Sequence, residues 1–308
     1  RSIPAAPLVY GRRPYGPSSQ LGDTIMIRPR EHTREGLPDG REVWIHAERV
    51  RDVTRHPMFK PAVDIRARIY DMQHDAATRD LMTYEEGGET FAIGNRLPRE
   101  QKDWHDKRAA GDAVMYDIGG VVTRMGDETV GEMWSLWDGK DILNEIDPRF
   151  AANIERHIKE SIALDPFHVS ANTDPKGDRS KPPQDQDPDM LVHVVKETDA
   201  GIIIRGAKYE TAAAYANQAF LKPTIANWGD AKLSEYALGC IVKMNAPGVK
   251  HICRTGFTGR APARDYPPSN KFDEVDTIFI LDTVLIPWED VLFYQHTRAA
   301  AFIRQTLL

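Results

Sequence analysis

The sequence is poor in cysteine, since its 308 residues include only Cys240 and Cys253. Two thiols are too few for a disulfide framework, and too few for a four-thiolate zinc or iron-sulfur site. We therefore expect no metal site and a reducing compartment, the cytoplasm.

Long apolar runs are also missing. No stretch of about 18 apolar residues is present to cross a bilayer, and the first twenty residues, RSIPAAPLVYGRRPYGPSSQ, lack the apolar core of a secretory signal. We expect no membrane partner, and we interpret this segment as a tail or as an arm that lies on a partner.

A basic surplus and the common nucleotide motifs are absent too. The net charge is -6, which gives no electrostatic reason to expect nucleic acid as a partner. No two of the 22 glycines stand at i and i+2, so the G-x-G-x-x-G motif of dinucleotide-binding domains is excluded. Small molecules are the expected ligands.

The composition that remains, 41% hydrophobic and 28% charged, is typical of a folded globular protein. Three segments of the first half have the spacing of amphipathic helices: PAVDIRARIYDMQHD from Pro61, a second from Pro98 to Gly119, and DPRFAANIERHIKESIAL. In the last, apolar residues recur at i+4 steps from Phe150 to Ile162. Ahead of them, GREVWIHAERV predicts two short strands around a turn.

After residue 165, apolar and polar residues alternate as in half-buried strands. DMLVHVVKETDAGIIIRGAKYET predicts a hairpin around Asp199–Gly201, and YALGCIVKMNAPGVKHICR predicts a second hairpin around Pro247–Gly248. VDTIFILDTVLIP adds a strand. Pro287 then opens WEDVLFYQHTRAAAFIRQTLL, which we expect to be helical.

His168 stands where the third helix gives way to the strands. Its ring either bonds nearby backbone carbonyls or faces a cleft, as loop residues at such junctions do. Three short polar side chains follow, Ser170, Asn172 and Thr173. These either turn the chain through local hydrogen bonds or hold a polar ligand.

Two further positions have the same two interpretations. Arg124 precedes Glu128 by four residues, so the two form either an exposed ion pair or part of a site. Thr211 begins TAAAYA, whose small side chains allow either tight sheet packing or the close approach of something flat.

Several longer segments occur in a recognisable order from Pro38 to Val291. They are DGREVWIHAERVRDVTRHPMFKPAVDIRARIYDMQH, HVSANTDPKGDRS, VVKETDAGIIIRGAKYETAAA, APGVKHICR and DYPPSNKFDEVDTIFILDTVLIPWEDVL. Together they resemble the oxygenase component of the 4-hydroxyphenylacetate 3-hydroxylase family, two-component aromatic monooxygenases that use reduced flavin.

The resemblance implies an α+β, acyl-CoA-dehydrogenase-like fold with a helical domain, an antiparallel β-barrel and a C-terminal helical bundle. On this chain we expect an N-terminal arm at residues 1–37, the helical domain at 38–164 and the barrel at 165–287. Residues 288–308 are then the truncated start of the bundle.

The resemblance also implies roles for single residues. Arg124 and His168 match the catalytic pair that grips a phenolic oxygen, and Glu128 completes the expected substrate site, at a place where relatives with simple phenol substrates have a tyrosine. The residues expected to bind the cofactor are His168, Ser170, Asn172, Thr173, Thr211 and Ala212.

The implied cofactor is FAD, supplied as FADH2 by a separate flavin reductase, with molecular oxygen as co-substrate; FMN stays an alternative. The implied reaction hydroxylates a phenolic or related aromatic molecule through a flavin C4a-hydroperoxide. A histidine that takes the phenolic proton, beside an arginine that stabilises the oxyanion, lowers the barrier. We expect a homodimer or homotetramer. The alternative function is a catalytically silent flavoprotein-like subunit or binding module of the same fold.

Overall fold

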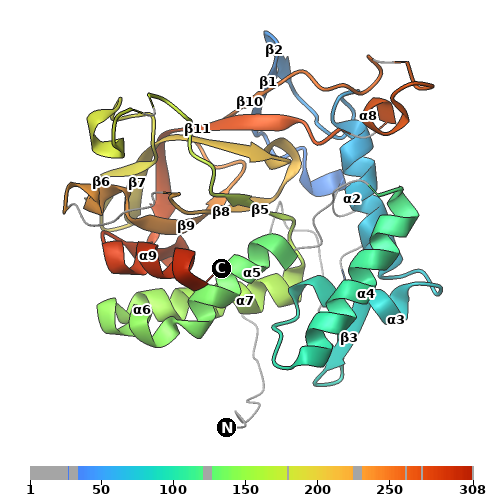
Figure 1. Ribbon diagram of the computed structural model, residues 1–308, viewed down its shortest axis with the longest axis horizontal. Helices are drawn as coiled ribbons and strands as arrows, with labels where there is room; N and C mark the ends of the chain where they lie inside the picture. Colours follow the sequence, from blue (N-terminus) through green and yellow to red (C-terminus); the bar gives the residue numbers. More distant parts are fainter. Residues whose placement is uncertain are drawn as a thin grey trace.

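The computed structural model describes residue 27 and residues 34–120, 127–178, 180–224, 231–260, 262–271 and 273–306. Most of its strands lie together, with helices beneath them and to one side, whereas β3 lies among the helices at the lower right (Figure 1). The helices are α2 (Lys60–Met72), α3 (Arg79–Met82), α4 (Gln101–Ile118), α5 (Asp127–Asp138), α6 (Lys140–Ile146), α7 (Pro148–Leu164), α8 (Pro267–Lys271) and α9 (Thr297–Thr306). The strands are β1 (Glu42–Ile45), β2 (Glu48–Val50), β3 (Thr83–Glu86), β4 (Glu89–Ala92), β5 (His168–Ala171), β6 (His193–Thr198), β7 (Gly201–Thr211), β8 (Gln218–Leu221), β9 (Leu238–Lys243), β10 (Val249–Cys253), β11 (Asp276–Pro287) and β12 (Val291–Tyr294).

The three predicted helices are confirmed as α2, α4 and α7. Helix α4 ends at Gly119, which takes the left-handed conformation with φ 78°, as glycine does at helix ends. Helix α7 begins at Asp147, whose side chain accepts a hydrogen bond from the Arg149 backbone N–H at 2.9 Å. The predicted stripe of α7 is buried at Phe150, Ile154 and Ile158, because this face packs on the core.

Ten of the described strands form two sheets, and β3 and β4 pair with each other. The six-stranded sheet has the order β2-β1-β10-β11-β7-β6, and the four-stranded sheet has the order β12-β9-β8-β5. Each contains one parallel pair, β1 with β10 and β5 with β8. The described strands therefore do not form the single antiparallel barrel that the sequence led us to expect, and neither sheet closes on itself within the described residues.

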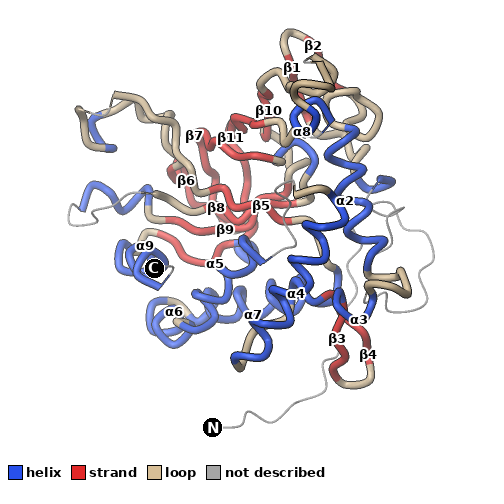
Figure 2. Tube along the Cα trace, turned by 45° about the vertical axis from the view of Figure 1, so that its right-hand side comes forward, coloured by secondary structure: helices blue, strands red, loops and turns tan. Residues whose placement is uncertain are grey.

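The four-stranded sheet is the middle layer. Figure 2 shows it between the six-stranded sheet and the helices α5, α6 and α7. Every residue of β5 and β8 is buried, as are the first five residues of β9. A sheet covered on both faces favours mostly apolar residues over alternation, and its buried polar residues His168, Ser170 and Gln218 are hydrogen-bonded.

The first predicted hairpin is confirmed as β6 and β7. The second is wrong, because β9 and β10 belong to different sheets. The turn at Pro247–Gly248 carries the chain from the middle layer to the outer sheet. Gly248 allows this turn, because its φ is 91° and a Cβ there would lie 2.5 Å from the Asp282 carbonyl oxygen.

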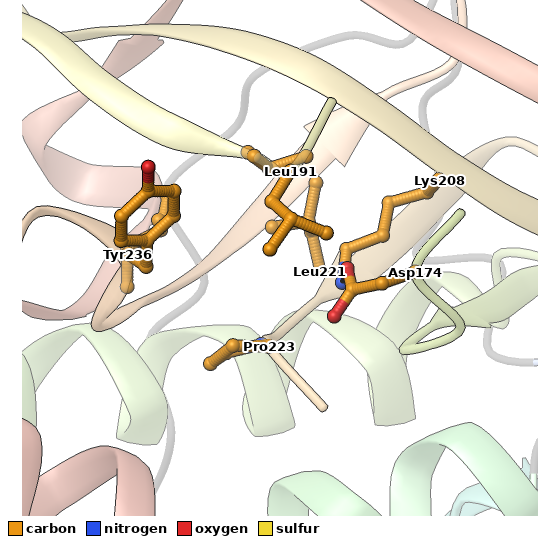
Figure 3. Close-up of a pocket in the computed structure, with 8 residues that line it drawn as sticks. Asp174, Leu191, Lys208, Leu221, Pro223 and Tyr236 are labelled. Carbon is orange, nitrogen blue, oxygen red and sulfur yellow. Dashed lines mark hydrogen bonds and ion pairs between the residues drawn. The ribbon is translucent and has the colours of Figure 1, made fainter. Parts of the chain in front are cut away.

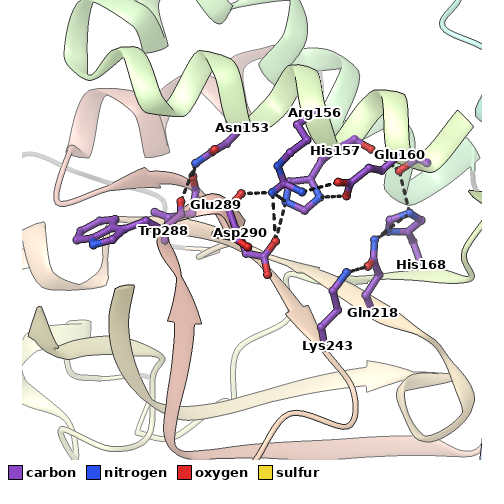
Figure 4. Close-up of polar contacts among 12 residues, drawn as sticks. Asn153, Arg156, His157, Glu160, His168, Gln218, Lys243, Trp288, Glu289 and Asp290 are labelled. Atoms are coloured by element: carbon purple, nitrogen blue, oxygen red, sulfur yellow. Dashed lines mark hydrogen bonds and ion pairs between the residues drawn. The ribbon is translucent and has the colours of Figure 1, made fainter. Parts of the chain in front are cut away.

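The predicted helix after Pro287 begins later than expected. Residues Trp288–Asp290 form a 3-10 turn and β12 follows, pairing with β9, before α9 starts at Thr297. Helix α7 holds this turn, since Asn153 Nδ2 donates to the carbonyls of Trp288 and Val291 at 2.7 Å each (Figure 4). A strand forms here because pairing with β9 buries three apolar side chains, those of Val291, Leu292 and Phe293.

The strands are not all in the second half of the chain. Residues 165–287 hold most strands, but β1 and β2 come from the preceding part and extend the six-stranded sheet. None of the described helices is long and apolar enough to cross a membrane.

Candidate functional site

Strand β5 and the two residues after it carry four of the predicted site residues, His168, Ser170, Asn172 and Thr173, and they pack against α5 and α7. The Ser170 hydroxyl donates to Glu132 Oε2 on α5 at 2.6 Å. Just past the strand, Asn172 Nδ2 donates to Glu132 Oε1 at 3.2 Å. The predicted Ser170 and Asn172 are therefore held by a carboxylate that the sequence analysis did not single out.

Glu132 also faces Lys222, the residue after β8. The Lys222 ammonium lies 3.4 Å from Glu132 Oε1, and both residues are buried. A buried carboxylate is tolerated when it is paired and hydrogen-bonded in this way. Glu132 stands one helical turn after Glu128 on α5, and that i+4 spacing was the signal available in the sequence.

His168 is enclosed at the start of β5, with none of its surface exposed. Its ring Nε2 lies 3.1 Å from the Ser161 hydroxyl of α7, and its Nδ1 lies 3.1 Å from Gln218 Nε2 (Figure 4). The pKa of His168 lies well below its ordinary value of 6.5. Burial is the larger cause, and the positive charge of Lys243 adds to it. The ring is therefore neutral at pH 7.

Thr173 is joined to the far end of β7, because its carbonyl accepts a hydrogen bond from the Tyr209 backbone N–H at 2.9 Å. Two residues further along β7 comes Thr211, which is half-buried, and then Ala212 in the left-handed region with φ 63°. Ala212 and the alanines after it are buried. The structure thus brings the predicted residues of β5 and of β7 to one neighbourhood.

A second ion pair, between the buried Lys208 and the half-buried Asp174, lies beside this neighbourhood. Lys208 Nζ lies 2.5 Å from Asp174 Oδ1 and donates to the Lys222 carbonyl at 2.6 Å. Burial lowers the pKa of Lys208, and the charge of Asp174 opposes that change. The cavity beside the pair (Figure 3) encloses about 10 Å³, which is room for one water molecule at most. It is too small for a cofactor.

Two predicted site residues cannot be placed in this way. Arg124 lies outside the described residues, and for Glu128 the description is limited to its backbone in α5. Among the described residues, no group of three His, Cys, Asp or Glu side chains is arranged to hold a metal ion.

Part of this neighbourhood has the chemistry to hold a flavin. Asn172, Thr173 and Thr211 are half-buried and present hydroxyl, amide and backbone groups, which suit the polar edge of a flat heterocycle. Ala212, Ala213 and Ala214 follow Thr211 with small side chains. His168, Ser170 and Ala212 are enclosed by this chain itself. The half-buried residues fit the group.

Comparison with known proteins gives matches along most of the chain. The family described as "4-hydroxyphenylacetate 3-hydroxylase N terminal" matches residues 30–293. The 4-nitrophenol 2-monooxygenase oxygenase component of a Rhodococcus species is 34% identical over 281 residues, covering 88% of this chain and 52% of the relative. The 4-hydroxyphenylacetate 3-monooxygenase oxygenase component of Thermus thermophilus is 31% identical over 251 residues, covering 81% and 51%.

A solved structure agrees with these matches. The oxygenase component of 4-hydroxyphenylacetate 3-monooxygenase, complexed with FAD and 4-hydroxyphenylacetate, superposes with a TM-score of 0.80 at 29% identity. The match covers 89% of this chain and 57% of the solved chain. The chain spans about half the length of the curated relatives it matches.

Proposed function

Because this chain belongs to the 4-hydroxyphenylacetate 3-hydroxylase family, we propose that its protein is the oxygenase component of a two-component, flavin-dependent aromatic monooxygenase. The observation that carries the proposal is the superposition, over most of this chain, on an oxygenase complexed with FAD and its phenolic substrate. The proposed reaction is the hydroxylation of a phenolic or related aromatic small molecule.

The cofactor in this proposal is FAD, bound in its reduced form and replenished by a separate reductase. When bound, reduced FAD supplies the chemistry that activates molecular oxygen. Asn172, Thr173 and Thr211 hold the polar edge of the flavin ring. Ala212 has a small side chain, which lets the ring approach the backbone closely. A helical bundle of the kind expected after residue 287, in a homodimer or homotetramer, closes the site. The cytoplasm is the proposed compartment.

The substrate in this proposal lies between α5 and β5. Arg124 stabilises the phenolic oxyanion, Glu128 accepts a hydrogen bond from a further group of the substrate, and His168 takes the phenolic proton. The neutral state of the His168 ring supports this last role, since a neutral imidazole has a lone pair to accept a proton. Because the ring is fully enclosed, contact with a phenol requires it to part from Ser161 or Gln218.

The experiment supplies the full-length protein with FAD, NADH, a generic flavin reductase and a panel of phenols. We expect the formation of catechols, with less hydrogen peroxide per NADH consumed than when the phenol is omitted. Excluding water from the site protects the oxygenating species, so product and peroxide should change in opposite directions. Peroxide formation without hydroxylated product for any phenol, despite FAD binding, would favour a catalytically silent subunit.

A further inference from the structure

Glu132 joins three separate elements at the centre of the site. Its carboxylate accepts from Ser170 on β5 at 2.6 Å and from Asn172 beyond β5 at 3.2 Å, and it pairs with Lys222 after β8 at 3.4 Å. We infer that Glu132, with Lys222, is a positioning residue that fixes the substrate-side helix α5 against the flavin-side end of β5. This inference rests on the proposed function.

The burial of the pair argues for a geometric role. Glu132 is 7% exposed, Lys222 is 9% exposed, and Ser170 is 3% exposed. Removing two charges from water is costly, so a buried ion pair is often no more stabilising than apolar residues of the same volume. What such a pair provides better than an apolar contact is direction, because hydrogen bonds with a carboxylate require aligned donors. Here the aligned donors are the side chains at the end of β5.

The hydrogen bonds have one direction. Thr173 Oγ1 donates to Asn172 Oδ1 at 3.3 Å, and Asn172 Nδ2 donates to Glu132. Ser170 likewise commits its proton to the carboxylate. The half-buried Asn172 and Thr173 therefore keep oxygen lone pairs for a ligand, whereas Ser170 is enclosed. An edge of acceptors suits a ligand that presents N–H groups, as a reduced flavin ring does.

The bond between Glu132 and Ser170 also positions α5. Glu128 stands one turn earlier on the same helix, so the bond between Glu132 and Ser170 sets how far that turn lies from β5. Misplacement of a bound substrate by about 1 Å can cost on the order of 100-fold in rate. Loss of the bond should therefore affect both cofactor binding and the coupling of oxygen use to hydroxylation.

The test is Glu132→Gln in the full-length protein, which keeps the shape of the side chain and removes its charge. We expect the dissociation constant for FAD, measured by fluorescence, to rise about tenfold, and the share of oxygen released as hydrogen peroxide to increase. The same two measurements apply to Ser170→Ala, a smaller change that reports on the same contact if Glu132→Gln does not fold.

Asp103→Asn is the matched control. Asp103 is also a buried carboxylate, paired with Arg96 at 2.7 Å and accepting backbone N–H groups at the start of α4. We expect it to lower the thermal midpoint while the FAD dissociation constant and the peroxide share stay at wild-type values. Equal effects of the control and of Glu132→Gln on FAD affinity would overturn the inference, as would wild-type affinity and coupling in both site variants. Failure of the wild-type protein to bind FAD would instead overturn the proposed function itself.

Discussion

His168 is the residue for which sequence and structure give the sharpest contrast. The resemblance assigns it the phenolic proton, whereas the structure encloses its ring between Ser161 and Gln218. The sequence could not decide this, since burial of a residue just after a helix depends on which strand pairs beside it. Here β8 pairs in parallel and sets Gln218 opposite His168.

We predict that His168→Ala abolishes hydroxylation while the protein continues to consume oxygen and to release hydrogen peroxide. Loss of the ring leaves a cavity, and the Ser161 hydroxyl and the Gln218 amide lose their hydrogen bonds to it. The free energy of unfolding should therefore also fall by about 2–4 kcal/mol. Product and peroxide are measured well below the unfolding temperature.

His251→Ala controls for the loss of stability. His251 is equally enclosed, and its Nε2 lies 2.9 Å from the Met244 carbonyl. Its replacement should destabilise the protein without changing the ratio of product to peroxide. Wild-type hydroxylation by His168→Ala would contradict the proton-accepting role.

A second prediction at this scale concerns Glu128, which the family resemblance matches to a tyrosine in relatives with simple phenol substrates. Glu128→Tyr should raise kcat/KM for 4-hydroxyphenylacetate by about tenfold, because an added phenol hydroxyl contributes one hydrogen bond to the substrate. Steady-state rates on a phenol panel measure this. Glu145→Tyr on α6, at an exposed position, is the control and should leave the panel unchanged.

At the scale of elements, the pairing of β12 with β9 depends on one glycine. A Cβ built on Gly239 would lie 2.1 Å from Cε1 of the buried Phe293 ring. We predict that Gly239→Ala lowers the free energy of unfolding by about 1–3 kcal/mol, because the ring has to leave its rotamer. Urea unfolding measures this.

Gly111→Ala provides the opposite case. Gly111 lies inside α4, and a Cβ there would meet nothing within 4 Å. We expect this substitution to stabilise the protein by about 0.5–1 kcal/mol. Destabilisation of similar size by both substitutions would show that the contact with Phe293 is not the cause.

Which elements were predictable depends on how local their signals are. The periodicity of Phe150, Ile154 and Ile158 identified α7 because an amphipathic helix shows its buried face in its own sequence. The hairpin of β3 and β4 was missed, although Gly87 and Gly88 form its turn with φ of 64° and 86° and two glycines between short strands are a known hairpin signal. The separation of β9 from β10, and the strand β12, arise from contacts with distant residues, which no local pattern records.

The candidate site shows the same division. Ser170, Asn172, Thr173 and Thr211 were named from the sequence, and the structure brings their two strands together. Glu132 and Lys222 were not named, because their meaning comes from α5, β5 and β8 meeting in space. The sequence signals of this buried ion pair are its two charges and the i+4 spacing of Glu132 from Glu128, and neither shows that the pair is buried.

At the scale of the whole molecule, three enclosed histidines couple stability to pH. Burial lowers the pKa of His157 and His168, and lowers that of His251 to about 4. Between each lowered pKa and 6.5, the unfolded chain binds a proton that the native protein does not bind. The free energy of unfolding is therefore highest above pH 6.5 and decreases as the pH falls below it. The slope is at most about 1.4 kcal/mol per pH unit for each histidine.

Urea unfolding at pH 7.5, 6.5, 5.5 and 4.5 measures this slope. The variant His251→Gln should show a shallower slope between pH 6.5 and 4.5, since it lacks one of the groups that titrate in the unfolded state. Stability that is flat over this range in the wild-type protein would contradict the assignment.

The parallel pairing of β1 with β10 has a consequence for how the protein is made. His46 and Thr255, which follow these strands and are hydrogen-bonded at 2.9 Å, are 209 residues apart in the sequence. A ribosome adding about 5–20 residues per second needs roughly 10–40 s to pass from one to the other. The edge of β1 that β2 does not cover has no partner strand until β10 leaves the exit tunnel, so that edge is open to aggregation while the chain is made.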